Sequence, residues 1–166
     1  MNIAGEWIVV CERVIHDALT ENLTLVSCLE RVGALHFPAT HANFGIAARY
    51  RCLDGAPPTP VDVHFRLVRV GEDAPEEELM RFVSSWGPVA TRFRMGTNFQ
   101  LLRLNKPELL TFRIDHSMDG AKWNLGPSCT LDVVRMKLTP QEREAMREQL
   151  IARGLPTDDL DAGVDP

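Results

Sequence analysis

Apolar and polar side chains alternate along most of this chain, most clearly in the stretch that begins at Glu108. The alternate positions there hold Leu110, Phe112, Ile114 and His116, and the positions between them hold Thr111, Arg113 and Asp115. Period-two patterning is typical of a half-buried antiparallel strand. Asp119–Gly120 follows, a dipeptide that tolerates positive φ at both centres of a tight hairpin turn. The pattern therefore predicts a strand over 108–116 that ends in such a turn.

Six further segments carry strand patterns, separated by turns rich in proline, glycine or polar residues. The expected strands, including the first, are 6–15, 23–32, 43–52, 61–70, 99–104, 108–116 and 128–137. Residues 34–42 between two of them are expected to form a loop, because Pro38 has no donor for a strand ladder. Seven or eight short strands spaced by turn signals predict an all-β fold, an antiparallel β-sandwich of the Greek-key or jelly-roll kind.

Residues 79–86 fit two patterns. Helical spacing is met by Leu79, Phe82, Val83 and Trp86, whereas strand alternation is met by Met80, Phe82, Ser84 and Trp86. Periodicity alone does not resolve a short apolar run. We expect a strand, because the neighbouring segments are all strands.

The period changes after the last strand, which predicts a C-terminal helix over 139–153. Thr139 supplies a capping residue, Pro140 a proline at the first helical position and Glu142 an acid in the first turn. Gly154 then suits the position after the helix end. The helix carries only a narrow apolar stripe, formed by Met146, Leu150 and Ile151. It is expected to dock on its own sandwich or on another chain, and the sequence leaves both open.

The length of the chain and the distribution of its charges predict one domain followed by an acidic C-terminal region. The 166 residues are enough for one domain with a core that needs no disulfide or metal. Residues 138–166 hold seven of the 23 acids and three of the 18 bases, so the net charge of −5 lies mostly there and the remainder is close to neutral. We expect a sandwich domain over 1–137, a helix within 138–155 and an acidic, disordered tail over 156–166.

Several protein classes are disfavoured by the same composition. Nucleic-acid binders normally show a basic excess, which this chain lacks. No apolar run approaches the ~18 residues of a membrane span, and the N-terminus has no basic segment typical of a secretory signal. We therefore expect no nucleic-acid or membrane partner and a cytoplasmic protein whose cysteines stay reduced thiols. The cysteines are Cys11, Cys28, Cys52 and Cys129.

No motif in the sequence predicts catalysis, a cofactor or a metal site. The cysteines show no C-x-x-C spacing and are better explained as core thiols. Asp115, His116 and Ser117 have the side chains of a catalytic triad, but neighbours on a strand point to opposite faces and cannot relay a proton. Nucleotide-binding and hydrolase signatures are missing as well. The sequence predicts a protein that is not an enzyme.

Two places remain as candidate interaction sites. His36, Phe37 and His41 cluster around Pro38 in the expected loop, and loops on a rigid sandwich often carry function. The other candidate is the helical stripe of Met146, Leu150 and Ile151. For the loop cluster, a covered end of the sandwich is the alternative explanation.

The N-terminal third resembles a family of uncharacterised bacterial proteins known as domain of unknown function 6941. The resemblance lies in the run from Val9 to Glu12 with Asp17 soon after, in the strand that contains Leu25, Val26 and Glu30, and in Phe37–Pro38. Thr24 stands where that family usually has serine. A later hairpin over 101–114 is also similar, whereas the helix and tail are not covered. The resemblance implies a small cytoplasmic bacterial β-sandwich without an assigned activity or catalytic residues.

We therefore expect a non-enzymatic protein-interaction module that binds a protein partner or a second copy of itself as a homodimer. Arg49 and Arg51 are expected to protect one sheet edge, whereas the 99–104 strand is a less charged edge suited to pairing. The alternative is a sandwich that binds a small molecule or carbohydrate, with Trp86, Trp123 or the Phe37–Pro38 loop as the stacking platform.

Overall fold

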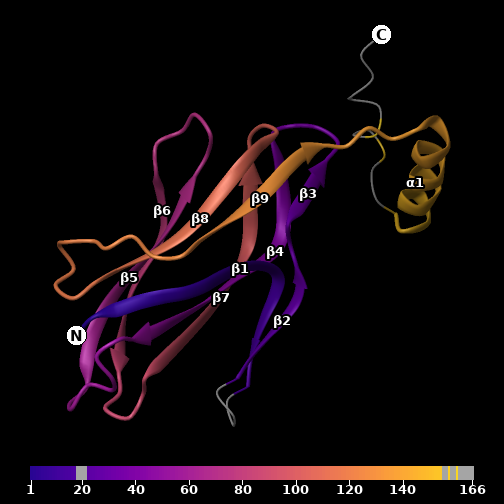
Figure 1. Cartoon of the computed structure of the whole chain (residues 1–166). Helices are drawn as coiled ribbons and strands as arrows, with labels where there is room; N and C mark the ends of the chain where they lie inside the picture. The colour runs from indigo at the N-terminus through magenta and orange to yellow at the C-terminus, as the bar shows by residue number, and fades with distance from the viewer. Residues whose placement is uncertain (18–21, 155–156, 158–159, 161–166) are drawn as a thin grey trace.

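The computed structural model describes residues 1–17, 22–154, 157 and 160. Two sheets, mostly antiparallel, face each other, which confirms the all-β sandwich (Figure 1). Nine strands are formed by these residues, slightly more than expected. They are β1 (Ile3–His16), β2 (Leu23–Cys28), β3 (Arg31–Ala34), β4 (Ala39–Cys52), β5 (Val61–Val70), β6 (Glu77–Trp86), β7 (Arg92–Leu104), β8 (Glu108–Ser117) and β9 (Ser128–Arg135). The strand order is β2-β1-β4-β7 in one sheet and β3-β9-β8-β5-β6 in the other.

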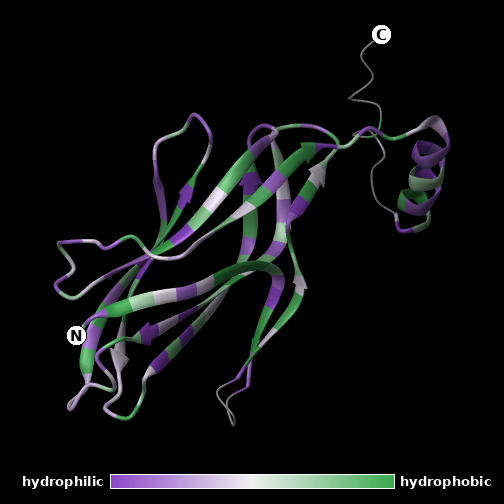
Figure 2. Cartoon of the chain, viewed as in Figure 1, coloured by the Kyte–Doolittle hydropathy of each residue, from purple (hydrophilic) through white to green (hydrophobic). Residues whose placement is uncertain are grey.

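Hydrophobic and hydrophilic residues alternate along the strands, as Figure 2 shows. The inward residues of both sheets form one core, whose largest fully buried side chains are Trp86, Tyr50, Phe44, Phe65 and Phe112. Phe65 stacks on Phe82 of β6 and on Phe93 of β7, with ring centroids 5.4 and 5.5 Å apart. Residues 79–86 lie in strand β6, so the strand prediction for this segment is confirmed.

The single strand predicted over 23–32 is wrong, because this segment forms two strands in different sheets. β2 pairs with β1, and β3 pairs in parallel with β9. Between them Ser27 adopts a φ of 50°, and the Leu29 N–H donates to the Val10 carbonyl. The chain thus crosses from one sheet to the other with no proline or glycine to mark the crossing.

The loop predicted over 34–42 is also too long, because β4 already begins at Ala39. Asn43 has a φ of 58°, and the inward alternation changes phase around it. Phe44 and every second residue after it face the core, whereas before Asn43 the core contact is made by Ala39. Because of this change of phase, strict alternation does not identify the first residues of the strand, 39–42.

The tight hairpin turn predicted at Asp119–Gly120 is absent from the described chain. Instead, ten residues, 118–127, connect β8 to β9. Gly120 alone of the pair has positive φ, at 71°. The Asp119 carboxylate accepts hydrogen bonds from the Ala121 and Lys122 N–H groups and from the Ser117 hydroxyl, which hold its pKa at about 2. These local bonds favour a wider loop.

Arg49 and Arg51 do not protect a sheet edge, because β4 lies between β1 and β7. Arg49 instead pairs with Glu6 of β1, with 2.6 Å between Nε and Oε2. The segment 99–104 belongs to β7, the outer strand of its sheet, so its edge position is confirmed and its pairing stays a prediction.

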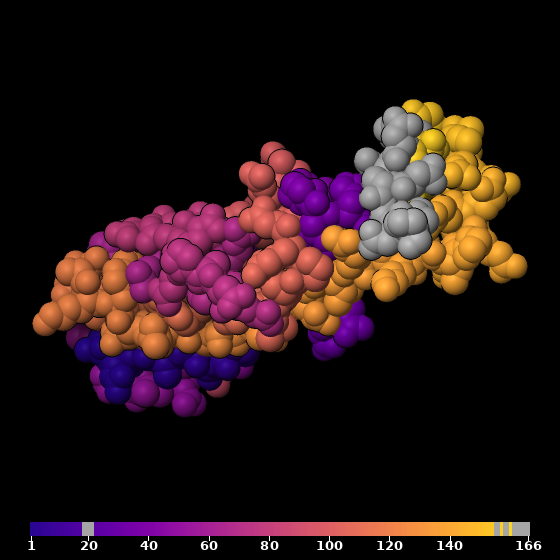
Figure 3. Space-filling model, turned by 90° about the horizontal axis from the view of Figure 1, so that it is seen from above, coloured from indigo at the N-terminus to yellow at the C-terminus, as the bar shows by residue number. Residues whose placement is uncertain are grey.

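Helix α1 (Pro140–Ala152) stands apart from the sandwich at one end of the molecule (Figures 1 and 3). Its predicted start is confirmed: Thr139 caps it in a reciprocal capping box with Glu142, and Pro140 occupies the first position. Gly154 follows the helix with a φ of 67°. None of the helical residues is buried. Within the described residues, no helix combines the length and apolar character that crossing a bilayer requires.

Candidate functional site

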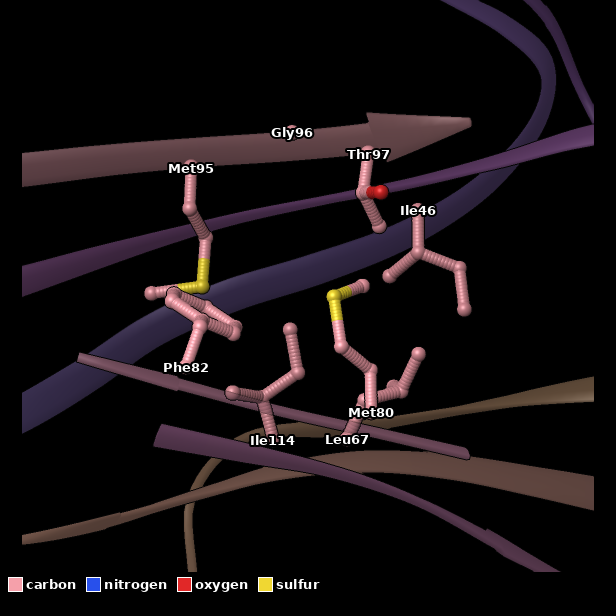
Figure 4. A pocket seen from close by; sticks show the side chains of 8 residues that line it. All are labelled: Ile46, Leu67, Met80, Phe82, Met95, Gly96, Thr97 and Ile114. Carbon is pink, nitrogen blue, oxygen red and sulfur yellow. The ribbon is translucent and has the colours of Figure 1, made fainter. Parts of the chain in front are cut away.

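An apolar cavity of about 190 Å³ opens between the two sheets on the side where β6 and β7 lie. Figure 4 shows Met95 and Thr97 projecting from β7 toward Met80 and Phe82 of β6. The lining residues are Ile46, Leu67, Met80, Phe82, Met95, Gly96, Thr97 and Ile114. None of these lining residues carries a charge, so the cavity is suited to an apolar ligand.

The cavity exists because β6 and β7 are the outer strands of different sheets and do not pair with each other. Its floor consists of Ile46, Leu67 and Ile114, each at most 3% exposed. Met80 and Met95 lie half-buried at the mouth. Sequence reasoning missed this site, since its residues come from five strands and share no local motif. Two methionines at inward positions of edge strands are the one signal that could have indicated it.

A buried charged cluster lies on the outer face of the five-stranded sheet and centres on Asp115 of β8. The Arg113 Nε donates to Asp115 Oδ1 at 2.6 Å, and Arg66 Nη2 lies 2.9 Å from Oδ2. Burial by itself would raise the pKa of Asp115. Hydrogen bonds from Arg113, the Gly126 N–H and Arg66 outweigh it, so the pKa lies below its usual range.

The loop 118–127 covers this cluster. Its Trp123 ring lies against two guanidinium groups, with Arg66 at 4.9 Å and Arg81 at 5.1 Å from the ring centroid. Cation–π contacts of this kind are worth ~0.5–2 kcal/mol. The Asp115 side chain is 0% exposed. Its carboxylate is thus committed to holding the loop on the sheet and is closed to any reacting molecule from solvent.

The next residue, His116, points to the opposite face, as predicted. Its ring contacts Tyr50 edge-on at 5.7 Å between centroids, and its Nδ1 is buried without a hydrogen-bond partner. Burial lowers the pKa of His116, although the nearby Asp115 charge acts in the other direction. The sequence argument that Asp115 and His116 cannot relay a proton is consistent with this placement.

We expect acid to weaken the fold partly through His116. In the unfolded chain the imidazole takes up a proton near pH ~6.5, whereas folded His116 does so only at lower pH. Neutral His116 therefore contributes its full stabilisation above the unfolded pKa of ~6.5. This stabilisation is lost as the pH falls from there toward the lower pKa of the folded state. Urea midpoints measured from about pH 7 to pH 5 should fall less in His116→Gln than in the parent. The control His16→Gln, at an exposed site, should keep the parent's dependence.

The cluster predicted as an interaction site does not lie wholly in a loop. His36 and Phe37 lie in the connection 35–38, which has a cis Phe37–Pro38 bond, whereas His41 lies in β4. Phe37 packs against the core, and the Arg135 guanidinium lies 5.9 Å from its ring centroid. His36 Nδ1 and His41 Nε2 are both buried without a hydrogen-bond partner. The half-buried cluster matches the covered sandwich end that the sequence left open.

Neither tryptophan provides the expected stacking platform. Trp86 is 1% exposed and its Nε1–H donates to the Ala90 carbonyl at 2.6 Å. Trp123 already has Arg66 and Arg81 as ring partners. The Trp86 platform is therefore wrong, whereas a sugar at Trp123 would have to share the ring with these guanidinium groups.

The cysteines lie in strands of both sheets. Cys11 and Cys52 are buried, and Cys11 lies directly opposite Cys28 in the β1–β2 register. Burial raises the pKa of Cys129 to about 11, which keeps it a protonated thiol. Among the described residues, no group of three or more histidines, cysteines or acids could hold a metal ion.

The helical stripe is only partly accessible. Met146 and Leu150 are half-buried and Ile151 is 64% exposed. The predicted disordered tail over 156–166 falls largely outside the described residues. Of that stretch, Leu160 is buried and donates its N–H to the Thr157 carbonyl.

Comparisons with known proteins give no family. No protein-family model matches the chain, and no curated protein matches it. A superoxide reductase (neelaredoxin) from Ignicoccus hospitalis is similar over 78% of this chain and 82% of its own, with 12% identity and a TM-score of 0.35. A family 123 glycoside hydrolase from Clostridium perfringens is similar over 85% of this chain but 29% of its own, with 11% identity and a TM-score of 0.39. At such low TM-scores, neither similarity bears on the activity of this chain.

Proposed function

We propose that this protein is a non-enzymatic interaction module in which the sandwich carries α1 as the segment that binds another protein chain. The observation that supports the proposal is that α1 has complete caps at both ends but no buried residue. A helix of this quality held away from its own core is suited to the helix-in-groove mode of recognition.

The energetics of α1 favour an external partner. A helix of 13 residues is marginal in water, and most helical stability in proteins comes from packing an apolar face. The Thr139 cap contributes ~0.5–2 kcal/mol. Met146 and Leu150 are half-buried and Ile151 is 64% exposed, so completing their burial would add only part of the ~1.5–3 kcal/mol that each side chain gains on burial from full exposure. A partner groove that covers this stripe would therefore supply the burial that the sandwich does not.

The charged cluster supports the non-enzymatic part of the proposal. Asp115 is the one fully buried carboxylate in the described chain, and buried carboxylates are common candidates for catalysis. Here two guanidinium groups and a backbone N–H occupy it. Its perturbed pKa is thus accounted for by a structural ion pair. We also propose that the protein works in the cytoplasm, where its thiols would stay reduced.

A second copy of the chain is the first partner to test. β7 is a 13-residue edge strand, and the backbone groups along such an edge can pair with another chain. Arg92, Arg94 and Arg103 are exposed along it, so a partner strand would have to place acidic or uncharged residues opposite them. Homodimer formation would use this edge, the helix or both.

Photo-crosslinking tests the proposal directly. A photoreactive amino acid at position 151, in the full chain in its native cells, should give a discrete crosslinked product. The same group at position 145, which is exposed on the side of α1 away from the apolar stripe, is the matched control and should give much less. A product of twice 18.6 kDa identifies a second copy. No product at position 151, or equal products at both positions, would contradict the proposal.

A further inference from the structure

We propose that the cavity between β6 and β7 binds a small uncharged ligand with one apolar group, either a single aromatic ring or a short alkyl chain. The proposal is independent of the role of α1, because the lining residues all belong to the sandwich: Ile46, Leu67, Met80, Phe82, Met95, Gly96, Thr97 and Ile114.

The size of the cavity limits the ligand. Its volume is about 190 Å³. An engineered apolar cavity of ~150 Å³ in another protein stays dry and binds benzene, whereas drug-sized ligands need ~300 Å³ or more. A ring of benzene size or an alkyl chain of similar volume fits this range. A sugar, nucleotide or steroid is too large or too polar.

The chemistry of the lining limits it further. The Thr97 hydroxyl is the single polar side-chain group in the described lining, and no charged group is present to pair with an ionised ligand. A buried unpaired charge would cost several kcal/mol, so the ligand is neutral. Met80 and Met95 are flexible and polarizable and adapt their shape to an apolar guest. A ligand hydroxyl, if present, would bond to Thr97.

The fold provides a route into the cavity. β6 and β7 share no backbone ladder, so a ligand can pass between them without breaking a hydrogen bond of either sheet. The floor residues Ile46, Leu67 and Ile114 lie on β4, β5 and β8, which have a paired strand on each side. A floor on doubly paired strands beneath a mouth that no ladder bridges is the arrangement expected of a small preformed site.

Methyl nuclear magnetic resonance of methionine-labelled full-length protein tests this proposal. The chain has six methionines, and Met80→Leu and Met95→Leu assign the two cavity signals. Benzene and n-hexanol are the probes for the aromatic and alkyl classes. Either probe should shift the Met80 and Met95 methyl signals in a saturable way. Met118, Met136 and Met146, which lie outside the lining, should not move.

Two substitutions at one position provide the matched controls. Thr97→Leu fills the cavity and should abolish the methyl shifts. Thr97→Val removes the hydroxyl at nearly constant volume and should weaken the binding of n-hexanol, which has a hydroxyl, more than that of benzene. In the parent, a probe at about five times its Kd should raise Tm by roughly 2–4 °C. Unchanged Met80 and Met95 signals at probe saturation, or equal movement of all six methionines, would overturn the proposal.

Discussion

Asp115→Asn is expected to lower the free energy of unfolding by about 3 kcal/mol, because it leaves two largely buried guanidinium groups without their central, fully buried counter-charge. Arg66 and Arg113 are 21% and 15% exposed, so water screens them poorly. The loss falls at the low end of the range for broken buried pairs because Glu76 still lies 2.7 Å from Arg113. Urea denaturation of both proteins at neutral pH measures the difference.

The matched control for Asp115→Asn is Asp132→Asn. Asp132 pairs with Arg31 at 2.8 Å, but the two side chains are 37% and 69% exposed. An exposed pair contributes ~0–1 kcal/mol, so this variant should be close to the parent. The pKa of Asp115 is lowered, so its contribution is complete above the unfolded pKa of ~3.9 and is lost as the pH falls through the folded value. Equal losses in both variants would contradict the role given to the cluster.

Gly126→Ala is expected to cost about 3 kcal/mol, since no space exists for a side chain at this position. A Cβ at Gly126 would lie 1.6 Å from the Ile114 carbonyl oxygen and 2.6 Å from the Tyr50 hydroxyl oxygen. The Tyr50 hydroxyl donates to that same carbonyl, so neither atom can move freely. The backbone must therefore shift and lose the hydrogen bond from Gly126 to Asp115.

Gly87→Ala is the matched control for this second substitution. A Cβ at Gly87 meets no atom within 4 Å, and its φ lies outside the left-handed region. Replacing such a glycine reduces the entropy of the unfolded chain and typically gains ~0.4–1 kcal/mol. Thermal unfolding of the two variants should therefore move in opposite directions. A Gly126→Ala variant as stable as the parent would show that the loop packs less tightly on β8 than the structure indicates.

The elements with a clear local signal, either strict alternation or a pair of helix caps, could be predicted from the sequence. Strict alternation located β5 and β8 almost to the residue, and the caps at Thr139 and Gly154 located α1. Two of the wrong predictions, over 23–32 and 34–42, concern places where the backbone changes course at a residue other than proline or glycine. Ser27 and Asn43 adopt positive φ as ordinary polar residues, so the crossing after β2 and the phase change in β4 leave no clear signal.

The sites were harder to predict because they depend on strand order. Asp115 and His116 were correctly placed on opposite faces of one strand. Arg66, the partner of Asp115, lies 49 positions before it in the sequence. The two residues come opposite each other only through the β5–β8 register. The same reasoning applies to the cavity, whose lining depends on which strands become the edges of each sheet. Periodicity gives the face of a residue, and register gives its neighbours.

The central claim is that the sandwich is complete without α1, which is kept for a partner. Thermal unfolding of residues 1–137 tests it most directly, because the deletion removes the helix and most of the net negative charge. The account predicts a soluble, folded sandwich whose Tm lies within a few degrees of the full chain, since no helical residue is buried. An insoluble or unfolded fragment would contradict it, because α1 would then be covering the core of its own domain.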